Sequence, residues 1–156
     1  FAKKSGQVLV LSGDVPLLRA QTIKDLGRVH LESGNIATVL SANFTDPAAY
    51  GRMIRDSNGQ VQKIVEAKDA SAEELQVREI NSGIYLFDVK LLFEYIQRLD
   101  SNNAQGELYL TDVVRFLVED NHKVGAMIGD DEDEIMGVNT IEQLAEVESV
   151  LKSRSC

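Results

Sequence analysis

Cysteine, tryptophan and proline are scarce in this chain of 156 residues, which has one cysteine, no tryptophan and two prolines. The single cysteine is the last residue, Cys156, so no disulfide can form within the chain and a zinc site built on several cysteines is excluded. We interpret this thiol as part of a frayed terminus and not as a catalytic group. The length and the 44% hydrophobic content suit one globular domain, or a large part of one.

Basic residues are also few: 16 Lys and Arg stand against 25 Asp and Glu, a formal charge of −9. Such a balance excludes a broad electrostatic surface for nucleic acid, so any phosphate must be held by local groups or by a metal. No apolar run approaches the roughly 18 residues of a membrane span, and no signal segment opens the chain. The sequence therefore predicts a cytoplasmic protein without membrane partners. Because the first residue is Phe1 and not Met, we expect a fragment or a processed product.

The apolar pattern predicts an α/β fold. Residues 8–11 are continuously apolar, as in a strand buried on both faces, and residues 36–40 form a second such run. Between them an amphipathic helix is expected, ended by Ser33 and Gly34, with one apolar side made by Ile23, Leu26, Val29 and Leu31. This strand-helix-strand order predicts a parallel pair in a mostly parallel sheet.

The second half of the chain continues the alternation. Asn58-Gly59 is a strong turn signal between residues 52–55 and 60–66, which predicts an antiparallel hairpin. Further expected elements are a brief helix opened by Ser71 and Glu74, a strand at 80–87, a helix from Asp88 to residue 98, a polar loop at 101–112 running into a helix, a strand at 123–128, and a last helix from Asn139 or Thr140 to about 152 with Glu142 in its capping box.

Several polar side chains stand where such a sheet would bind ligands, at the carboxyl ends of its strands. Asp14 follows the first apolar run and Gly13, and suits a hard cation such as Mg²⁺, although it could equally cap a turn before Pro16. Glu66 and Asn81 can hold sugar hydroxyls, but a solvated strand end and a bridge to backbone groups are the alternatives.

Other polar features are interpreted structurally. The acidic run at 130–134 is expected to be a solvated loop, because its charges would repel one another without an ion. His30 and His122 have no partner at ligand spacing, so core or surface roles are expected for both.

Five segments, in order along the chain, resemble the bacterial N-acetylglucosamine-1-phosphate uridyltransferases of the sugar-nucleotidyltransferase superfamily. They are LSGDVPLL, AYGRMIRDSNGQVQKIVEAKDA, EINSGIYLFD, NNAQGELYLTD and GVNT. The resemblance implies a Rossmann-like sheet with helices on both faces and the hairpin as an excursion. It also implies a Mg²⁺-dependent reaction in which N-acetylglucosamine 1-phosphate and UTP give UDP-N-acetylglucosamine and pyrophosphate, for cell wall and peptidoglycan synthesis.

The resemblance also implies a role for each matching residue. Asp14 of LSGDVP would bind the metal and act in catalysis, Asn139 of GVNT would be its partner, and Ser12 and Gly13 would lie along the nucleotide sugar. The contacts to the amino sugar would come from Gly51, Glu66, Asn81, Glu107, Tyr109 and Thr111.

The chain departs from the family pattern in one respect. Members of the family have a glycine-rich loop of the type LAAGxGTRM, which binds the triphosphate, and this loop does not occur in the chain. Hexapeptide repeats of an acetyltransferase domain do not occur either. We therefore expect residues 1–156 to be one partial domain that lacks the amino-terminal part of the fold and is inactive alone. Its first strand would then expose an apolar edge, which predicts self-association. A transferase for another sugar phosphate, or a non-catalytic module that has lost the nucleotide loop, are the alternatives.

Overall fold

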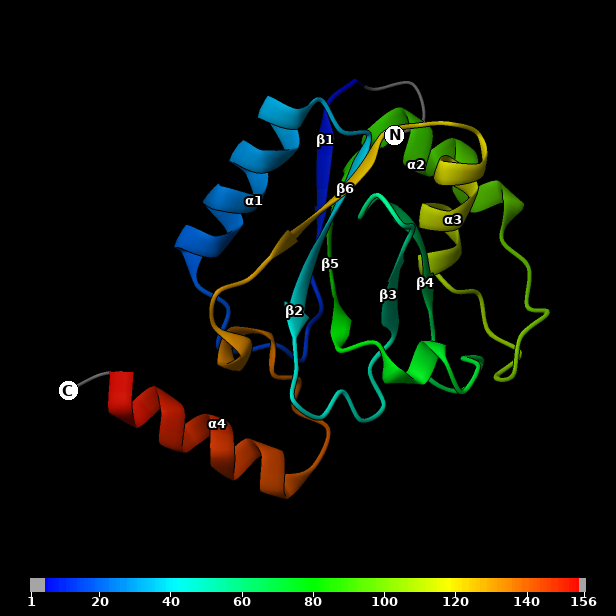
Figure 1. Ribbon diagram of the computed structural model, residues 1–156. Helices are drawn as coiled ribbons and strands as arrows, with labels where there is room; N and C mark the ends of the chain where they lie inside the picture. Colours follow the sequence, from blue (N-terminus) through cyan, green and yellow to red (C-terminus); the bar gives the residue numbers. More distant parts are fainter. Residues whose placement is uncertain (1–4, 155–156) are drawn as a thin grey trace.

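The computed structural model describes residues 5–154, so Cys156 lies outside the described part of the chain. The strands are β1 (Gln7–Val10), β2 (Ala37–Asn43), β3 (Arg52–Arg55), β4 (Val61–Val65), β5 (Glu79–Asp88) and β6 (Val124–Ile128). The helices are α1 (Ala20–Ser33), α2 (Val89–Tyr95), α3 (Thr111–Glu119) and α4 (Ile141–Arg154), with short 3₁₀ helices η1 (Glu74–Gln76), η2 (Ile96–Arg98) and η3 (Glu132–Ile135). In Figure 1 the strands occupy the middle of the molecule, α1 lies to one side, and α2 and α3 lie to the other. This arrangement confirms the α/β class with helices on both faces.

The sheet is mixed and not mostly parallel. Its strand order is β4-β3-β5-β2-β6, and β1 pairs with β5 outside this path. Of the pairings between described strands only β2–β6 is parallel. Strands β1 and β2 run in the same direction, as predicted, but β5 is inserted between them and is antiparallel to both. The predicted parallel pair is therefore wrong, because an apolar run indicates a strand but does not identify its neighbours.

Two hydrophobic clusters, one on each face of the sheet, form the core. Val39 of β2 packs into the cluster that α2 and α3 cover, whereas the next residue, Leu40, packs into the cluster that contains Leu26 of α1 and Ile135 of η3. This alternation is the period-2 pattern of a strand, so a β2 that is buried on both faces is mostly apolar. Its two buried polar side chains, Thr38 and Ser41, form hydrogen bonds with His30 and Glu79.

Local signals predicted the ends of several elements. The hairpin β3–β4 is confirmed, with Gly59 in its turn at φ +78°. Helix α1 ends at Gly34, which has the left-handed φ of +62° that glycine adopts readily. Leu31 is 68% exposed, so its predicted place on the buried side of α1 is wrong. His30 is buried instead and contacts Thr38 and Gln7, which confirms a core role.

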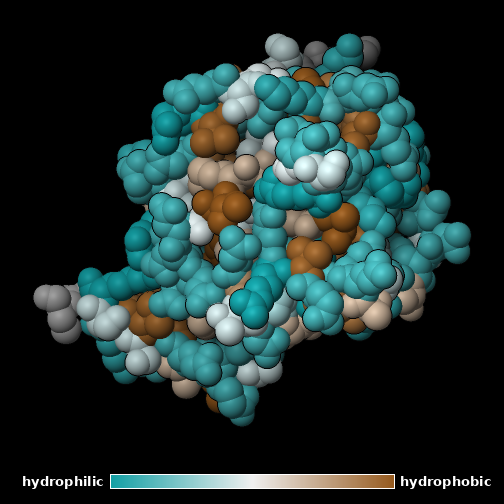
Figure 2. Space-filling model, in the orientation of Figure 1, coloured by the Kyte–Doolittle hydropathy of each residue, from teal (hydrophilic) through white to brown (hydrophobic). Residues whose placement is uncertain are grey.

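Helix α4 packs on the rest of the protein through few residues. Val147 is its buried side chain, and Arg154 donates a 3.1 Å hydrogen bond to the carbonyl of Leu17. Gln143, and not the predicted Glu142, completes the cap with Thr140. Figure 2 shows hydrophobic patches on the surface over this helix, where Ile141, Leu144 and Leu151 are exposed. None of the described helices combines the length and the apolar character needed to cross a membrane.

Candidate active site

A cleft of about 320 Å³ lies at the edge of the sheet where β1 and β4 end and where β3 and β5 begin. Most of the residues to which the sequence assigned a role line this cleft. They are Ser12, Asp14, Gly51, Glu66, Asn81 and Asn139. Segments that are far apart in the sequence thus meet at one place.

Strand pairing brings together three residues that are predicted to contact the sugar. Arg52 and Val65 are partners in the hairpin, so Gly51 and Glu66, which flank them, are neighbours at its open end. Both carboxylate oxygens of Glu66 lie 3.4 Å from the point where a Cβ on Gly51 would be placed. The backbone amide of Asn81 donates a 2.9 Å hydrogen bond to the carbonyl of Gly51. Glycine at position 51 therefore leaves the Glu66 carboxylate uncovered toward the cleft.

Asn81 is held by an irregularity in β5. The register between β2 and β5 shifts at Leu40 and Ser41, and Gly83 in the bulge has a φ of +76°. The amide of Gly83 donates to the side-chain oxygen of Asn81 at 3.1 Å, and the side-chain nitrogen donates to the phenol of Tyr85 at 2.7 Å. These bonds fix the Asn81 side chain at the wall of the cleft and leave one amide hydrogen and one lone pair available.

The environment of Glu66 favours its protonated form. Burial raises the pKa of this carboxyl, the nearby Asp69 and Asp112 raise it further, and the hydroxyl of Thr111 lowers it. Burial also raises the pKa of the Tyr85 phenol, and the negative charge of Glu66 adds to that effect. A partly buried carboxylate whose surroundings disfavour its charge is typical of a binding site.

The side of the cleft that is predicted to bind a metal is made by Asp14 and the 137–139 segment. The amide of Val138 donates a 2.8 Å hydrogen bond to the carbonyl of Asp14, which joins the two segments. The position of a Cβ on Gly137 would lie 3.2 Å from Oδ2 of Asp14 and 3.6 Å from the side-chain nitrogen of Asn139. The two predicted metal ligands therefore face the same small space beside Gly137.

This pair of residues fits a hard divalent cation. Within residues 5–154 the Asp14 carboxylate makes no hydrogen bond or ion pair, so its oxygens are available. Rotation of the Asn139 side-chain amide by half a turn would exchange its nitrogen and oxygen, so that the oxygen would face the same space as the Asp14 carboxylate. Two oxygen ligands from the protein leave the remaining positions to phosphate oxygens and water, as Mg²⁺ sites on nucleotides commonly do. No cluster of three or more His, Cys, Asp or Glu suitable for a metal occurs among the described residues.

Four of the predicted residues do not line this cleft. Gly13 is exposed beside it, and Glu107 is exposed on the loop before α3. Tyr109 and Thr111 line a second cavity of about 310 Å³, which shares Glu66 with the cleft. The hydroxyl of Thr111 is 3.5 Å from a carboxylate oxygen of Glu66, so Thr111 is linked to the cleft through that residue.

Several residues that line the cleft were not predicted from the sequence. Tyr50 and Gly137 line the cleft and contact each other, since the Gly137 amide donates a 3.0 Å hydrogen bond to the Tyr50 phenol. Ser82, Gly83 and Gln143 also line the cleft. A signal for Gly83 existed, because an isolated glycine in a strand pattern predicts a bulge. The contact between Tyr50 and Gly137 spans most of the chain and left no local signal.

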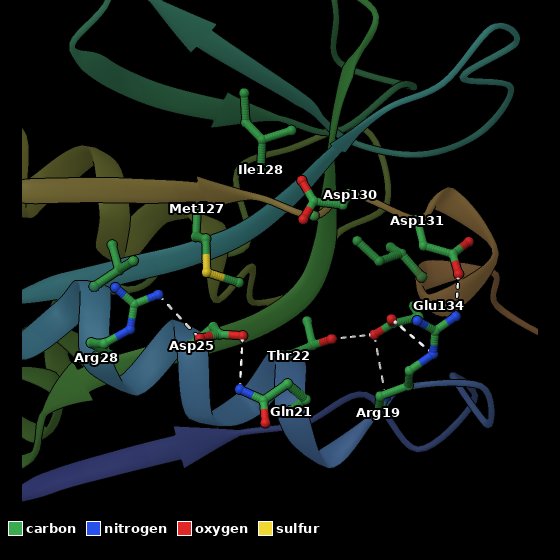
Figure 3. A pocket seen from close by; sticks show the side chains of 13 residues that line it. Arg19, Gln21, Thr22, Asp25, Arg28, Met127, Ile128, Asp130, Asp131 and Glu134 are labelled. Carbon is green, nitrogen blue, oxygen red and sulfur yellow. Dashed lines mark hydrogen bonds and ion pairs between the residues drawn. The ribbon is translucent and has the colours of Figure 1, made fainter.

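A larger cavity, of about 390 Å³, lies between α1 and the acidic run at 130–134. Figure 3 shows Arg19 reaching both Asp131 and Glu134, and Thr22 donating to Glu134. Glu134 is buried, so the expectation of a wholly solvated loop is wrong at that residue. Because these acids are neutralised by Arg19 and Arg154, we interpret the cluster as a structural attachment of α1 and α4.

Residues 1–149 match the nucleotidyl transferase family. Among curated proteins, the bifunctional protein GlmU of Clostridium botulinum is 51% identical over 151 residues, which are 97% of this chain and 33% of that protein. The bifunctional protein GlmU of Streptococcus mutans is 50% identical over 154 residues, 99% of this chain and 34% of that protein. The chain thus spans about a third of the length of these relatives.

A solved structure shares the fold at low sequence identity. It is a Bacillus anthracis protein described as a glucose-1-phosphate thymidylyltransferase, crystallised in complex with a sucrose. The match has a TM-score of 0.67 and 22% identity, and covers 92% of this chain and 54% of that one. With the family match over nearly the whole chain, these findings show that the chain belongs to the nucleotidyl transferase family.

Proposed function

We propose that this chain is the sugar-binding and metal-binding part of an enzyme that forms UDP-N-acetylglucosamine and pyrophosphate from UTP and N-acetylglucosamine 1-phosphate. The observation that carries the proposal is the meeting of Asp14, Glu66, Asn81 and Asn139 at one cleft. The choice of substrates rests on the resemblance of the five sequence segments, and the 51% identity to the bifunctional protein GlmU of Clostridium botulinum supports it.

Each group would have a separate part in binding. Glu66 and Asn81 would accept hydrogen bonds from sugar hydroxyls, and the bare backbone of Gly51 would let the sugar approach closely. Ser12 and Gly13 would lie along the ribose, and Glu107, Tyr109 and Thr111 along the acetamido side. Residues 1–156 would then be one partial domain.

The reaction joins two anions, so repulsion between their phosphates is the main obstacle. Asp14 and Asn139 would hold Mg²⁺, which supplies charge neutralisation and alignment of the phosphate oxygens. The side chains of this chain would fix the sugar phosphate so that its oxygen is in line with the α-phosphorus of UTP. The net charge of −9 makes a metal the natural counterion for bound phosphates.

Calorimetric titration of the chain with UDP-N-acetylglucosamine in Mg²⁺ tests the proposal. We expect weak but measurable binding that Asp14→Ala lowers by about tenfold or more, because a charged ligand contact is lost. Asp130→Ala, which removes an exposed carboxylate from the other cavity, is the matched control and should bind like the wild type. Absence of heat at millimolar ligand would contradict the proposal, and equal binding of UDP-glucose would indicate a transferase for another sugar phosphate.

We propose two further properties. The parent enzyme would act in the cytoplasm, as the sequence predicts. In the described residues β1 pairs only with β5, so its other edge is free to pair with a second copy of the chain.

A further inference from the structure

We infer that Tyr50 is a positioning residue that couples the metal side of the cleft to its sugar side. This inference rests on the proposed function, since it concerns how the two halves of that site act together. Tyr50 lies directly before Gly51 on the sugar side, and its phenol accepts the hydrogen bond from the Gly137 amide at 3.0 Å on the metal side.

The ring of Tyr50 is held by packing against a partly buried aromatic side chain. Phe44 packs against it edge to face, with ring centroids 5.2 Å apart and an interplanar angle of 62°. The hydroxyl therefore reaches Gly137 with little freedom to turn away. Gly137 itself is buried and faces Asp14 and Asn139, so a displacement of its amide would move the metal side.

The backbone of Tyr50 is fixed by Arg52. This arginine is only 3% exposed and donates to the carbonyls of Ala48, at 3.1 Å, and of Tyr50. A third, longer contact of 3.5 Å reaches the carbonyl of Pro47. The loop is tightly turned, since Ala48 has a φ of +41°. The guanidinium thus forms hydrogen bonds with several carbonyls of the loop on the sugar side of the cleft.

The way Arg52 is buried indicates that this loop is held at a cost to the fold. No acidic partner pairs with it within residues 5–154, and its Nε is buried without a hydrogen-bond partner. A buried cation without a counterion lowers the stability of the fold, and the hydrogen bonds of Arg52 to backbone carbonyls offset only part of this cost. We interpret this cost as the consequence of holding the Tyr50 loop rigid, so that its phenol meets Gly137 across the cleft.

Removal of the phenol oxygen separates this coupling from direct ligand contact. In Tyr50→Phe the ring stays packed on Phe44, while the hydrogen bond to Gly137 is lost. If Tyr50 couples the two sides, the enhancement of UDP-N-acetylglucosamine affinity by Mg²⁺ should fall by about fivefold, because coupling energies of this kind are small. If the hydroxyl instead only touched the ligand, affinity would fall equally with and without Mg²⁺.

The experiment combines calorimetry with hydrogen exchange on the full chain. We expect the Gly137 amide to exchange about tenfold faster in Tyr50→Phe, since its acceptor is gone. Tyr95→Phe is the matched control: it removes a phenol that donates a 2.6 Å hydrogen bond to Asp120 on another part of the molecule, and should leave the coupling unchanged. Arg52→Lys, which keeps the charge but loses the planar fork, should reduce the coupling in the same direction.

The outcomes distinguish this inference from the proposed function. Wild-type binding with an unchanged Mg²⁺ enhancement in Tyr50→Phe would overturn the coupling role alone. A wild-type chain that binds no UDP-N-acetylglucosamine in Mg²⁺ would overturn both. Equal thermal unfolding midpoints of Tyr50→Phe and Tyr95→Phe, with coupling reduced only in the former, would show that the loss is not a general effect of stability.

Discussion

The hydroxyl of Ser12 and the backbone of Gly83 are in direct contact, and Ser12 Oγ lies 3.2 Å from the carbonyl oxygen of Gly83, to which it donates. A Cβ added to Gly83 would overlap that hydroxyl more closely than real Cβ contacts allow. The end of β1 is therefore positioned at the cleft by a glycine of β5.

Gly83→Ala should destabilise the chain and displace Ser12. The φ of +76° disfavours a side chain, and the overlap with Ser12 adds to the cost, so we expect a loss of about 1–3 kcal/mol in the free energy of unfolding. Denaturant unfolding measures it. Gly27→Ala in α1 is the control, because a Cβ there would meet no atom within 4 Å, and it should be neutral or stabilising. Equal effects of the two substitutions would contradict the close contact.

Glu66→Gln should separate stability from sugar binding. Since the native pKa of Glu66 is raised, the folded protein binds more protons than the unfolded chain at pH values just above the ordinary glutamate pKa of 4.5. Stability contributed by this residue is therefore lost as the pH rises from about 4.5 through the raised pKa. The variant removes that dependence, so it should be more stable than the wild type at pH 7 and similar to it below pH 4.

The same substitution should weaken the binding of UDP-N-acetylglucosamine by roughly tenfold, because a charged acceptor for sugar hydroxyls becomes a neutral one. Thermal unfolding across pH and calorimetry check the two effects. A variant that is less stable at neutral pH, or that binds the ligand as tightly as the wild type, would contradict the role given to Glu66.

Self-association of the chain is expected through β1. Val8, Leu9 and Val10 are only half-buried, Leu11 is 48% exposed, and within the described residues β1 has β5 as its one partner. Light scattering at increasing concentration should show oligomers, and Leu11→Lys should reduce them, since a charge at a strand edge opposes pairing. Monodisperse monomer of the wild type at high concentration would refute this expectation.

The elements that the sequence predicted well are those set by neighbouring residues. The turn at Asn58-Gly59 and the cap at Asp88, which accepts from the Leu91 amide at 2.9 Å, depend on a few adjacent positions. The insertion of β5 between β1 and β2 depends instead on contacts between distant segments, which an apolar run does not encode. His30 in place of Leu31 on the buried side of α1 shows a further limit, because Gln7 and Thr38 satisfy a polar side chain that hydropathy alone would place outside.

In the candidate site, too, the sequence predicted residues within local motifs but not contacts between distant segments. The matched segments pointed to Asp14, Glu66, Asn81 and Asn139, and all four line one cleft. Tyr50 was not assigned a role, because its contact with Gly137 joins residues 87 positions apart. The roles of Gly13 and Glu107 remain predictions, since Gly13 is exposed beside the cleft and Glu107 is exposed on the loop before α3.

The position of the cation is the central claim, and paramagnetic broadening by Mn²⁺, used in place of Mg²⁺, tests it most directly. In an isotope-labelled chain with UDP-N-acetylglucosamine bound, substoichiometric Mn²⁺ should selectively remove the amide signals of Asp14 and of residues 137–139, and Asp14→Ala should restore them. Broadening centred on the carboxylates of Asp25 and Asp130 in the other cavity, with the signals of Asp14 and Asn139 unaffected, would contradict the account.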